Sequence, residues 1–136
     1  MRNFWIVPVL ALTLFGAARA DTLSPPPPAA VARALVGVWQ SIDDTRFSRE
    51  FRADGTAIDR YEGDPDGSQT GAWLLFAGNA PPPELAGHRA FVAKGFYLES
   101  RESGDTMLFA ITAVDRSALQ MINLDRGNTL SFNRLR

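Results

Sequence analysis

The stretch that decides the fold is "LVGVWQS", Leu35 to Ser41, the first segment after a proline run that has the character of a strand. Gly37 and Trp39 stand two residues apart and so share one face of an extended strand. A glycine lets another part of the chain approach closely, and a tryptophan on the same face can fill the end of a barrel with a large ring. The pattern predicts a first strand that begins at the closed end of a barrel.

From Val36 onward the chain consists of short alternating runs separated by turn residues, which is typical of all-β proteins. Asp54-Gly55, for example, is a strong signal for a tight hairpin. No helical pattern is long enough for a crossover between parallel strands. The expected strands are "VGVWQSI", "RFSREFR", "TAIDRYE" ending at "GDPDGS", "QTGAWLLFA", "RAFVAKGFYLES", "DTMLFAITAV", "SALQMINL" and "TLSFNRLR".

Short connections imply antiparallel neighbours, so we expect an all-β, eight-stranded antiparallel up-and-down meander. An open sheet of this kind would have two unpaired edges, and closure into a barrel removes both. We therefore predict a barrel, with a two-sheet sandwich as the alternative. The segment "PAAVARALVG" predicts a short N-terminal helix with Val31, Ala34 and Leu35 on one face and Gly37 as its stop.

Residues 1–20 have the features of a signal peptide: a positive Arg2, the apolar stretch "FWIVPVLALTLFGA", and the small-x-small ending "ARA". A membrane anchor is the alternative, but the apolar stretch is shorter than the roughly 20 residues that span a bilayer, and Pro8 interrupts it. We expect cleavage after Ala20 and no stable membrane insertion afterwards. The protein is then periplasmic or secreted.

Residues 21–30, "DTLSPPPPAA", predict a polyproline II tether, and residues 31–136 predict one barrel domain. The whole chain of 136 residues carries 14 basic and 15 acidic side chains, a balance that does not favour binding to nucleic acid. It has no cysteine, so the fold uses no disulfide and thiol chemistry is excluded. We expect no cofactor, and the sequence does not identify a protein partner.

Residues suited to catalysis or metal binding are scarce. The single histidine, His88, stands in "LAGHRAF" without a recognisable triad partner. "DPDG", Asp64 to Gly67, has the opening of a calcium loop, but Leu75 occupies the twelfth position, where a bidentate glutamate belongs. A turn is the better interpretation, and we predict a protein that is not an enzyme and has neither catalytic nor metal-binding residues.

Two charged residues stand on faces that are expected to point inward. Arg49 lies between Phe47 and Phe51 on one face of its strand, and Asp59 lies between Ala57 and Tyr61. An unpaired charge inside the barrel would cost several kcal/mol. The favoured interpretation is therefore structural, either a mutually satisfied pair or outward-facing side chains, and a polar grip on a ligand head group is the functional alternative. The candidate ligand-binding residues are Arg49, Asp59, Tyr61, Trp73, Phe91 and Tyr97, the aromatic ones as an apolar wall.

The closed end needs a cation. Trp39 requires a partner for its indole N–H and offers the face of its ring to a positive charge. Closure of the meander places the last strand beside the first, and "FNRLR" supplies Arg134, with Arg136 in reserve. We expect Gly37, Trp39 and Arg134 to form a structural floor.

Four motifs in order resemble the small bacterial lipocalin-like (calycin-type) domains: "G-x-W-x-S" from Gly37, "F-x-x-D-G-T" from Phe51, "G-x-W" from Gly71 and "R-G-N-T-L" from Arg126. The resemblance implies an up-and-down barrel and, commonly, a small apolar ligand. We expect an exported, non-enzymatic domain that binds a small apolar or amphipathic molecule. The alternative is a protein-interaction module, such as an inhibitor or an envelope-assembly component, that acts through an exterior loop such as "GNAPPPELAGHR". A hollow of ~300 Å³ or more lined by aromatic residues would favour the ligand.

Overall fold

The computed structural model describes residues 28–136 apart from 88 and 90. The predicted signal peptide, most of the predicted tether and His88 therefore lie outside the described residues. Within them, no helix is both long and apolar enough to cross a membrane. The elements are α2 (Pro28–Leu35), β1 (Gly37–Ser41), β2 (Phe47–Phe51), β3 (Thr56–Tyr61), β4 (Asp64–Ala77), β5 (Phe96–Glu102), β6 (Asp105–Val114), β7 (Ala118–Asn123) and β8 (Thr129–Arg134).

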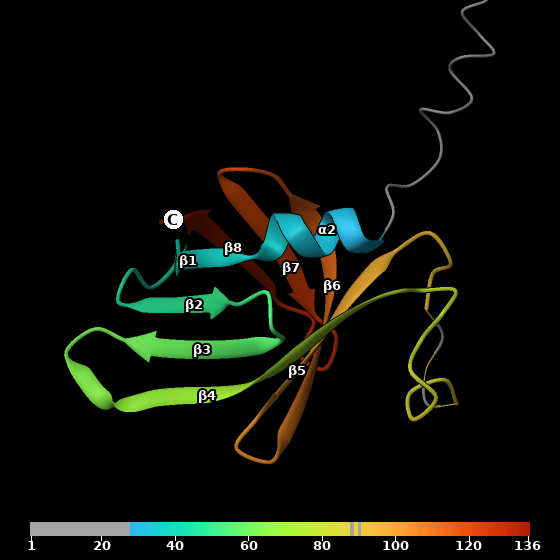
Figure 1. Cartoon of the computed structure of the whole chain (residues 1–136), viewed down its shortest axis with the longest axis horizontal. Helices are drawn as coiled ribbons and strands as arrows, with labels where there is room; N and C mark the ends of the chain where they lie inside the picture. Colours follow the sequence, from blue (N-terminus) through green and yellow to red (C-terminus); the bar gives the residue numbers. More distant parts are fainter. Residues whose placement is uncertain (1–27, 88, 90) are drawn as a thin grey trace, which may run out of the picture.

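The eight strands form one closed barrel in chain order, with every neighbouring pair antiparallel (Figure 1). β8 returns to pair with β1, and Trp39 lies opposite Arg134 in that ladder. Each strand therefore has a partner on both sides, which removes the unpaired edges of an open meander. The predicted barrel is confirmed, and the two-sheet sandwich is not the fold.

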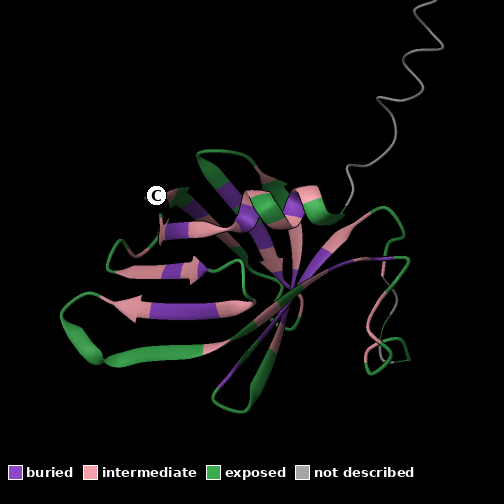
Figure 2. Cartoon of the chain, viewed as in Figure 1, coloured by how far each residue is buried: buried purple, intermediate pink, exposed green. Residues whose placement is uncertain are grey.

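One end of the barrel is closed. α2 lies against β4 and β6 and buries Val31 and Leu35, so the predicted short helix is confirmed. Figure 2 shows the buried parts of the strands in purple, and these include the apolar core as well as several buried polar side chains. The buried members of the core are Leu35, Trp39, Phe51, Ala57, Leu98, Phe109, Leu119, Met121 and Phe132. Because successive side chains of a strand alternate between faces, these residues also fix which face of each strand points inward.

The hairpin between β3 and β4 is longer than expected. β4 begins at Asp64 rather than Gln69, after a tight turn in which Gly63 has a φ of 84°. The pairing shifts between Asp59 and Tyr61, so the four residues 65–68 have no partners in the ladder. Within this bulge the Asp64 carboxylate accepts a hydrogen bond of 3.0 Å from the Gly67 amide, which is the turn chemistry expected there. The first half of β4 is exposed (Figure 2).

The predicted fifth strand, "RAFVAKGFYLES", is wrong in its first half. β5 begins at Phe96, and Phe91 belongs to the loop that joins β4 to β5. This loop is held to the outside of the barrel, where the Tyr97 hydroxyl accepts a hydrogen bond of 2.9 Å from the Val92 amide. Burial of the loop's apolar side chains on the outer surface replaces strand pairing for this segment. The resulting outer cluster consists of Phe76, Tyr97 and Leu108, with Leu85, Phe91, Ala110 and Leu124 packed against them.

Candidate functional site

At the closed end the three predicted floor residues meet. The guanidinium carbon of Arg134 lies 4.2 Å from the centroid of the Trp39 ring. Gly37 has a φ of +146°, and a Cβ there would lie 2.2 Å from Arg134 Nη1. The expected close approach and stacking contact are both present. Arg136 takes part through its backbone, because its carbonyl accepts a hydrogen bond of 2.6 Å from the Val38 amide.

The same residues complete the end of α2. Trp39 Nε1 donates to the Leu35 carbonyl at 2.8 Å, and Arg134 donates to the carbonyls of Ala34 at 2.6 Å and Val36 at 2.8 Å. The last carbonyls of a helix have no partner within the helix, and a cation near them also complements the helix dipole. Trp39 is fully buried. The side chains at the closed end are thus densely packed, and their role is structural.

The opposite end of the barrel holds an open cavity of about 590 Å³, which we call the barrel mouth. The strand ends around it provide more polar than apolar side chains. The cavity is larger than the ~300 Å³ above which a ligand site is expected, but it is not the aromatic-lined hollow that the sequence predicts. Its main inward-facing side chains are Phe47, Arg49, Asp59, Gln69, Glu102, Met107 and Asn123.

Arg49 and Asp59 form a buried pair in the barrel mouth. They lie opposite each other on β2 and β3, and the guanidinium donates to both carboxylate oxygens, at 2.6 and 2.7 Å. Burial opposes the charged form of Arg49, but the hydrogen bonds and negative charge of Asp59, together with Glu102, raise its pKa above the usual value. Of the two structural interpretations, the mutually satisfied pair is the one present, and neither side chain faces outward.

Glu102 lies on the inward face of β5 with Leu98 and Ser100, and is 4% exposed. Within the described residues its Oε2 atom has no hydrogen-bond partner, and neither has the Ser100 hydroxyl. Burial, and then a hydrogen bond with Asp59 and its negative charge, raise the pKa of Glu102 from 4.5 to about 7, against the effect of Arg49. The charge of the barrel mouth therefore changes near neutral pH.

The rim of the barrel mouth carries further charges. Asp105, Asp125 and Arg126 are exposed there, and Asp125 accepts a hydrogen bond of 2.8 Å from Arg89. Asn123 accepts hydrogen bonds from the amides of Asp125 and Arg126, at 2.9 and 3.1 Å, and so shapes the turn into β8. The rim contributes two carboxylates and one guanidinium, which leaves the lining of the mouth more acidic than basic.

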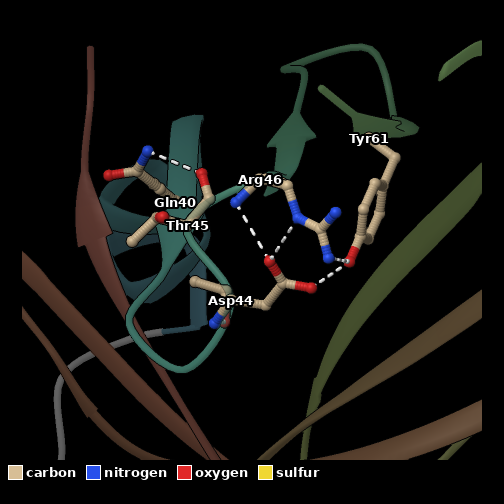
Figure 3. Close-up of polar contacts among 6 residues, drawn as sticks. Gln40, Asp44, Thr45, Arg46 and Tyr61 are labelled. Carbon is tan, nitrogen blue, oxygen red and sulfur yellow. Dashed lines mark hydrogen bonds and ion pairs between the residues drawn. The ribbon is translucent and has the colours of Figure 1, made fainter. Parts of the chain in front are cut away.

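Tyr61 does not lie in the barrel mouth. It borders a hollow of about 480 Å³ on the outer surface, where its hydroxyl donates to Asp44 (Figure 3). Arg46 donates to the same hydroxyl at 3.0 Å and lies 4.9 Å from the ring centroid. The hydrogen bond from Tyr61 lowers the pKa of Asp44, and that bond raises the pKa of Tyr61. These polar groups satisfy one another, so the outer hollow is a weaker candidate for a ligand site.

The predicted apolar wall does not form around the barrel mouth. Trp73 packs edge-on against Phe51, with ring centroids 5.4 Å apart, and donates from its indole nitrogen to the Arg52 carbonyl at 2.9 Å. Phe91 and Tyr97 belong to the outer cluster, with their ring centroids 4.8 Å apart. Because Leu98 points into the core, its neighbour Tyr97 must point outward. Arg49 and Asp59 are the two candidates that the structure brings together in the mouth.

Sequence reasoning missed Glu102, and the reason lies in the alternation of β5. One face of "FYLESRE" carries Tyr97, Glu99 and Arg101, and the other carries Leu98, Ser100 and Glu102. Each face mixes apolar and charged side chains, so the sequence does not show which one is inside. The sequence signal that could have indicated Glu102 is that it shares a strand face with Leu98. Within the described residues, no group of three or more histidine, cysteine or acidic side chains is arranged to hold a metal ion.

Compared with known proteins, the chain matches no family model, and no curated protein or solved structure is significantly similar to it. What the structure itself establishes is the closed eight-stranded antiparallel barrel with a short helix, an architecture compatible with a lipocalin-like fold.

Proposed function

We propose that the protein is an exported, non-enzymatic binding protein that holds a small amphipathic molecule in the barrel mouth. The observation that carries the proposal is Glu102, a 4% exposed carboxyl group on the wall of a cavity of about 590 Å³. Its Oε2 atom has no hydrogen-bond partner within the described residues. Buried polar atoms are nearly always paired, so a polar group of a ligand would satisfy this one. The cavity volume falls in the range of small-molecule sites.

The lining supports an amphipathic ligand rather than a wholly apolar one. Asp59, Gln69 and Glu102 offer hydrogen bonds on one side of the cavity, while Phe47 and Met107 offer apolar contact. Below the mouth the interior is filled by core side chains such as Phe109. A ligand would therefore sit in the mouth, with its polar group near Glu102, and would not reach the closed end.

Native mass spectrometry of the protein purified from its own compartment tests this proposal. The wild-type protein should retain a small molecule, and Met107→Trp should lose it because the larger side chain projects into the mouth and obstructs the ligand. Leu135→Trp is the matched control, since Leu135 is 51% exposed and borders the outer hollow. Retention by Met107→Trp, or loss in Leu135→Trp alone, would contradict a ligand in the mouth.

Export is supported by the signal-peptide features of residues 1–20. The intact mass of the mature protein should correspond to a chain that begins at Asp21. A mature mass that includes Met1 to Ala20 would contradict cleavage. The non-enzymatic part of the proposal is supported by the sequence, which offers one histidine and no cysteine to a catalytic constellation.

The alternative of a protein-interaction module has one observation in its favour. Val92, in the loop between β4 and β5, is 69% exposed. Leu85 and Phe91 of the same loop pack against the outside of the barrel, so these contacts fix the position in which the loop could present Val92 to a partner. If this alternative holds, the wild-type protein carries no small molecule, and Met107→Trp leaves the protein's activity in its own compartment unchanged.

A further inference from the structure

We infer that the ligand of the barrel mouth presents a cationic head group, a protonated amine, to the carboxylate of Glu102. This inference rests on the proposed function and specifies the chemical class of the molecule held there. Its geometric basis is a nearly buried acidic side chain on the wall of a cavity, whose Oε2 atom has no hydrogen-bond partner among the described residues.

The guanidinium of Arg49, deep in the barrel mouth, is already paired with a carboxylate. Arg49 is 5% exposed and donates from two of its nitrogens to both oxygens of Asp59. Its guanidinium carbon also lies 5.6 Å from the ring centroids of Phe47 and Phe109, which keeps it against the wall. A bidentate pair of this kind holds both partners in place. Arg49 is therefore poorly placed to receive an anionic head group.

The other charged side chains that line the barrel mouth are mainly acidic. After the Arg49–Asp59 pair, the facing groups are Glu102 on β5, Asp105 on β6, and Asp125 and Arg126 after β7; β4 and β7 contribute uncharged Gln69 and Asn123. Asp125 is paired with Arg89. Of the unpaired charged groups, the carboxyl groups of Glu102 and Asp105 are therefore opposed by the single positive charge of Arg126. Glu102 and Asp105 lie opposite each other in the β5–β6 ladder. An anion brought here would be repelled, whereas a cation would neutralise a carboxylate that has lost its water.

A cationic ligand competes with a proton for the Glu102 carboxylate. The pKa of Glu102 is raised to about 7, so below that pH its carboxyl group is neutral and above it the group is a buried anion. An alkylamine, like a lysine side chain, stays protonated up to about pH 10. It must displace the proton of Glu102 at low pH but meets a carboxylate at high pH. Linkage then predicts an amine affinity that is about tenfold weaker at pH 6 than at pH 8.

Three probes of equal chain length test the inference: octylamine, octanol and octanoate, titrated into the mature protein and followed by NMR shifts of the Met107 methyl group. Octylamine should bind about tenfold more tightly than octanol at pH 8, and octanoate should bind most weakly. The preference for the amine should shrink about tenfold at pH 6, while octanol binding should not change with pH.

Glu102→Gln preserves shape and removes the charge. It should weaken octylamine binding about tenfold and abolish its pH dependence, and leave octanol binding unchanged. Glu99→Gln is the matched control, because Glu99 lies on the same strand and is 3% exposed, but faces outward and is bound to Arg101 at 3.0 Å. It should change neither affinity. If Glu102→Gln does not fold, Asp105→Asn on the exposed rim should still weaken the amine two- to threefold.

The outcomes separate the inference from the proposed function. Tighter binding of octanol or octanoate than of octylamine would overturn the cationic head group and leave a ligand site in the mouth. An amine preference that survives in Glu102→Gln would also overturn it. No binding of any of the three probes, together with the absence of a retained molecule in native mass spectrometry, would overturn the proposed function as well.

Discussion

Replacing Arg134 by methionine should destabilise the closed end of the barrel strongly. The side chain donates to the carbonyls of Ala34, Val36 and Arg116 at 2.6 to 2.8 Å and stacks on Trp39 at 4.2 Å. One hydrogen bond from a charged group contributes about 1.5–3 kcal/mol, and a cation–π contact about 0.5–2 kcal/mol. The guanidinium is partly exposed and its contacts are not additive, so we expect the free energy of unfolding to fall by about 2–4 kcal/mol.

A double-mutant cycle of Arg134→Met with Trp39→Phe measures how much more strongly the guanidinium stacks on an indole than on a phenyl ring. Phenylalanine loses the indole hydrogen bond to Leu35 in both backgrounds, so that loss cancels in the cycle. The remaining coupling should be about 0.5 kcal/mol, because phenylalanine still offers a ring face, though a weaker one than tryptophan. Urea unfolding followed by far-ultraviolet circular dichroism measures all four proteins. Circular dichroism is preferable to fluorescence because Trp73 also emits.

The matched control is Arg52→Met, which removes an arginine whose side chain pairs with Glu50 at the surface, at 3.1 Å. An exposed ion pair of this kind contributes about 0–1 kcal/mol. Additivity of Arg134→Met and Trp39→Phe to within about 0.3 kcal/mol, with Arg134→Met costing no more than this control, would refute the floor.

Other changes address the barrel mouth and the opening glycine. Asp59→Asn, made in the Glu102→Gln background so that no second nearby carboxylate replaces the lost charge, leaves Arg49 buried without its bonded counter-charge and should cost about 3–5 kcal/mol in urea unfolding. A cost below about 1 kcal/mol would show that water reaches the guanidinium. Because the folded-state pKa of Glu102 is raised, the stability it contributes is fully present below pH 4.5 and is lost as pH rises to about 7. Wild-type stability should fall by roughly 2–3 kcal/mol across that window relative to Glu102→Gln, and parallel pH profiles of the two proteins would contradict the shift. Gly37→Ala should lower the melting temperature by about 10 °C or more, because the new Cβ would clash with Arg134 and because L-residues rarely adopt the φ of Gly37. An unchanged melting temperature would show that the residues of the floor can shift at little cost in free energy.

The sequence by itself determined the order of the strands and favoured their closure into a barrel over a two-sheet sandwich. Alternating apolar side chains and short turns act locally, and an antiparallel meander of this length has two edges that only closure removes. The same reasoning placed Gly37, Trp39 and Arg134 together, because closure brings the last strand beside the first. If both faces point inward, the sequence also implies that Arg49 pairs with Asp59, since an inward arginine without a counter-charge is too costly to bury.

Only the tertiary structure decided what the inside of the barrel contains. A shift of one residue exchanges the two faces of a strand, and in β5 both faces are plausible, so the placement of Glu102 depends on packing against the other strands. The outer cluster around Tyr97 draws Phe91 away from the interior for a similar reason, because a loop can bury apolar area on either side of a sheet. The barrel mouth itself arises where core side chains stop filling the space between strands, and that boundary is a property of three-dimensional packing, which no local pattern in the sequence encodes.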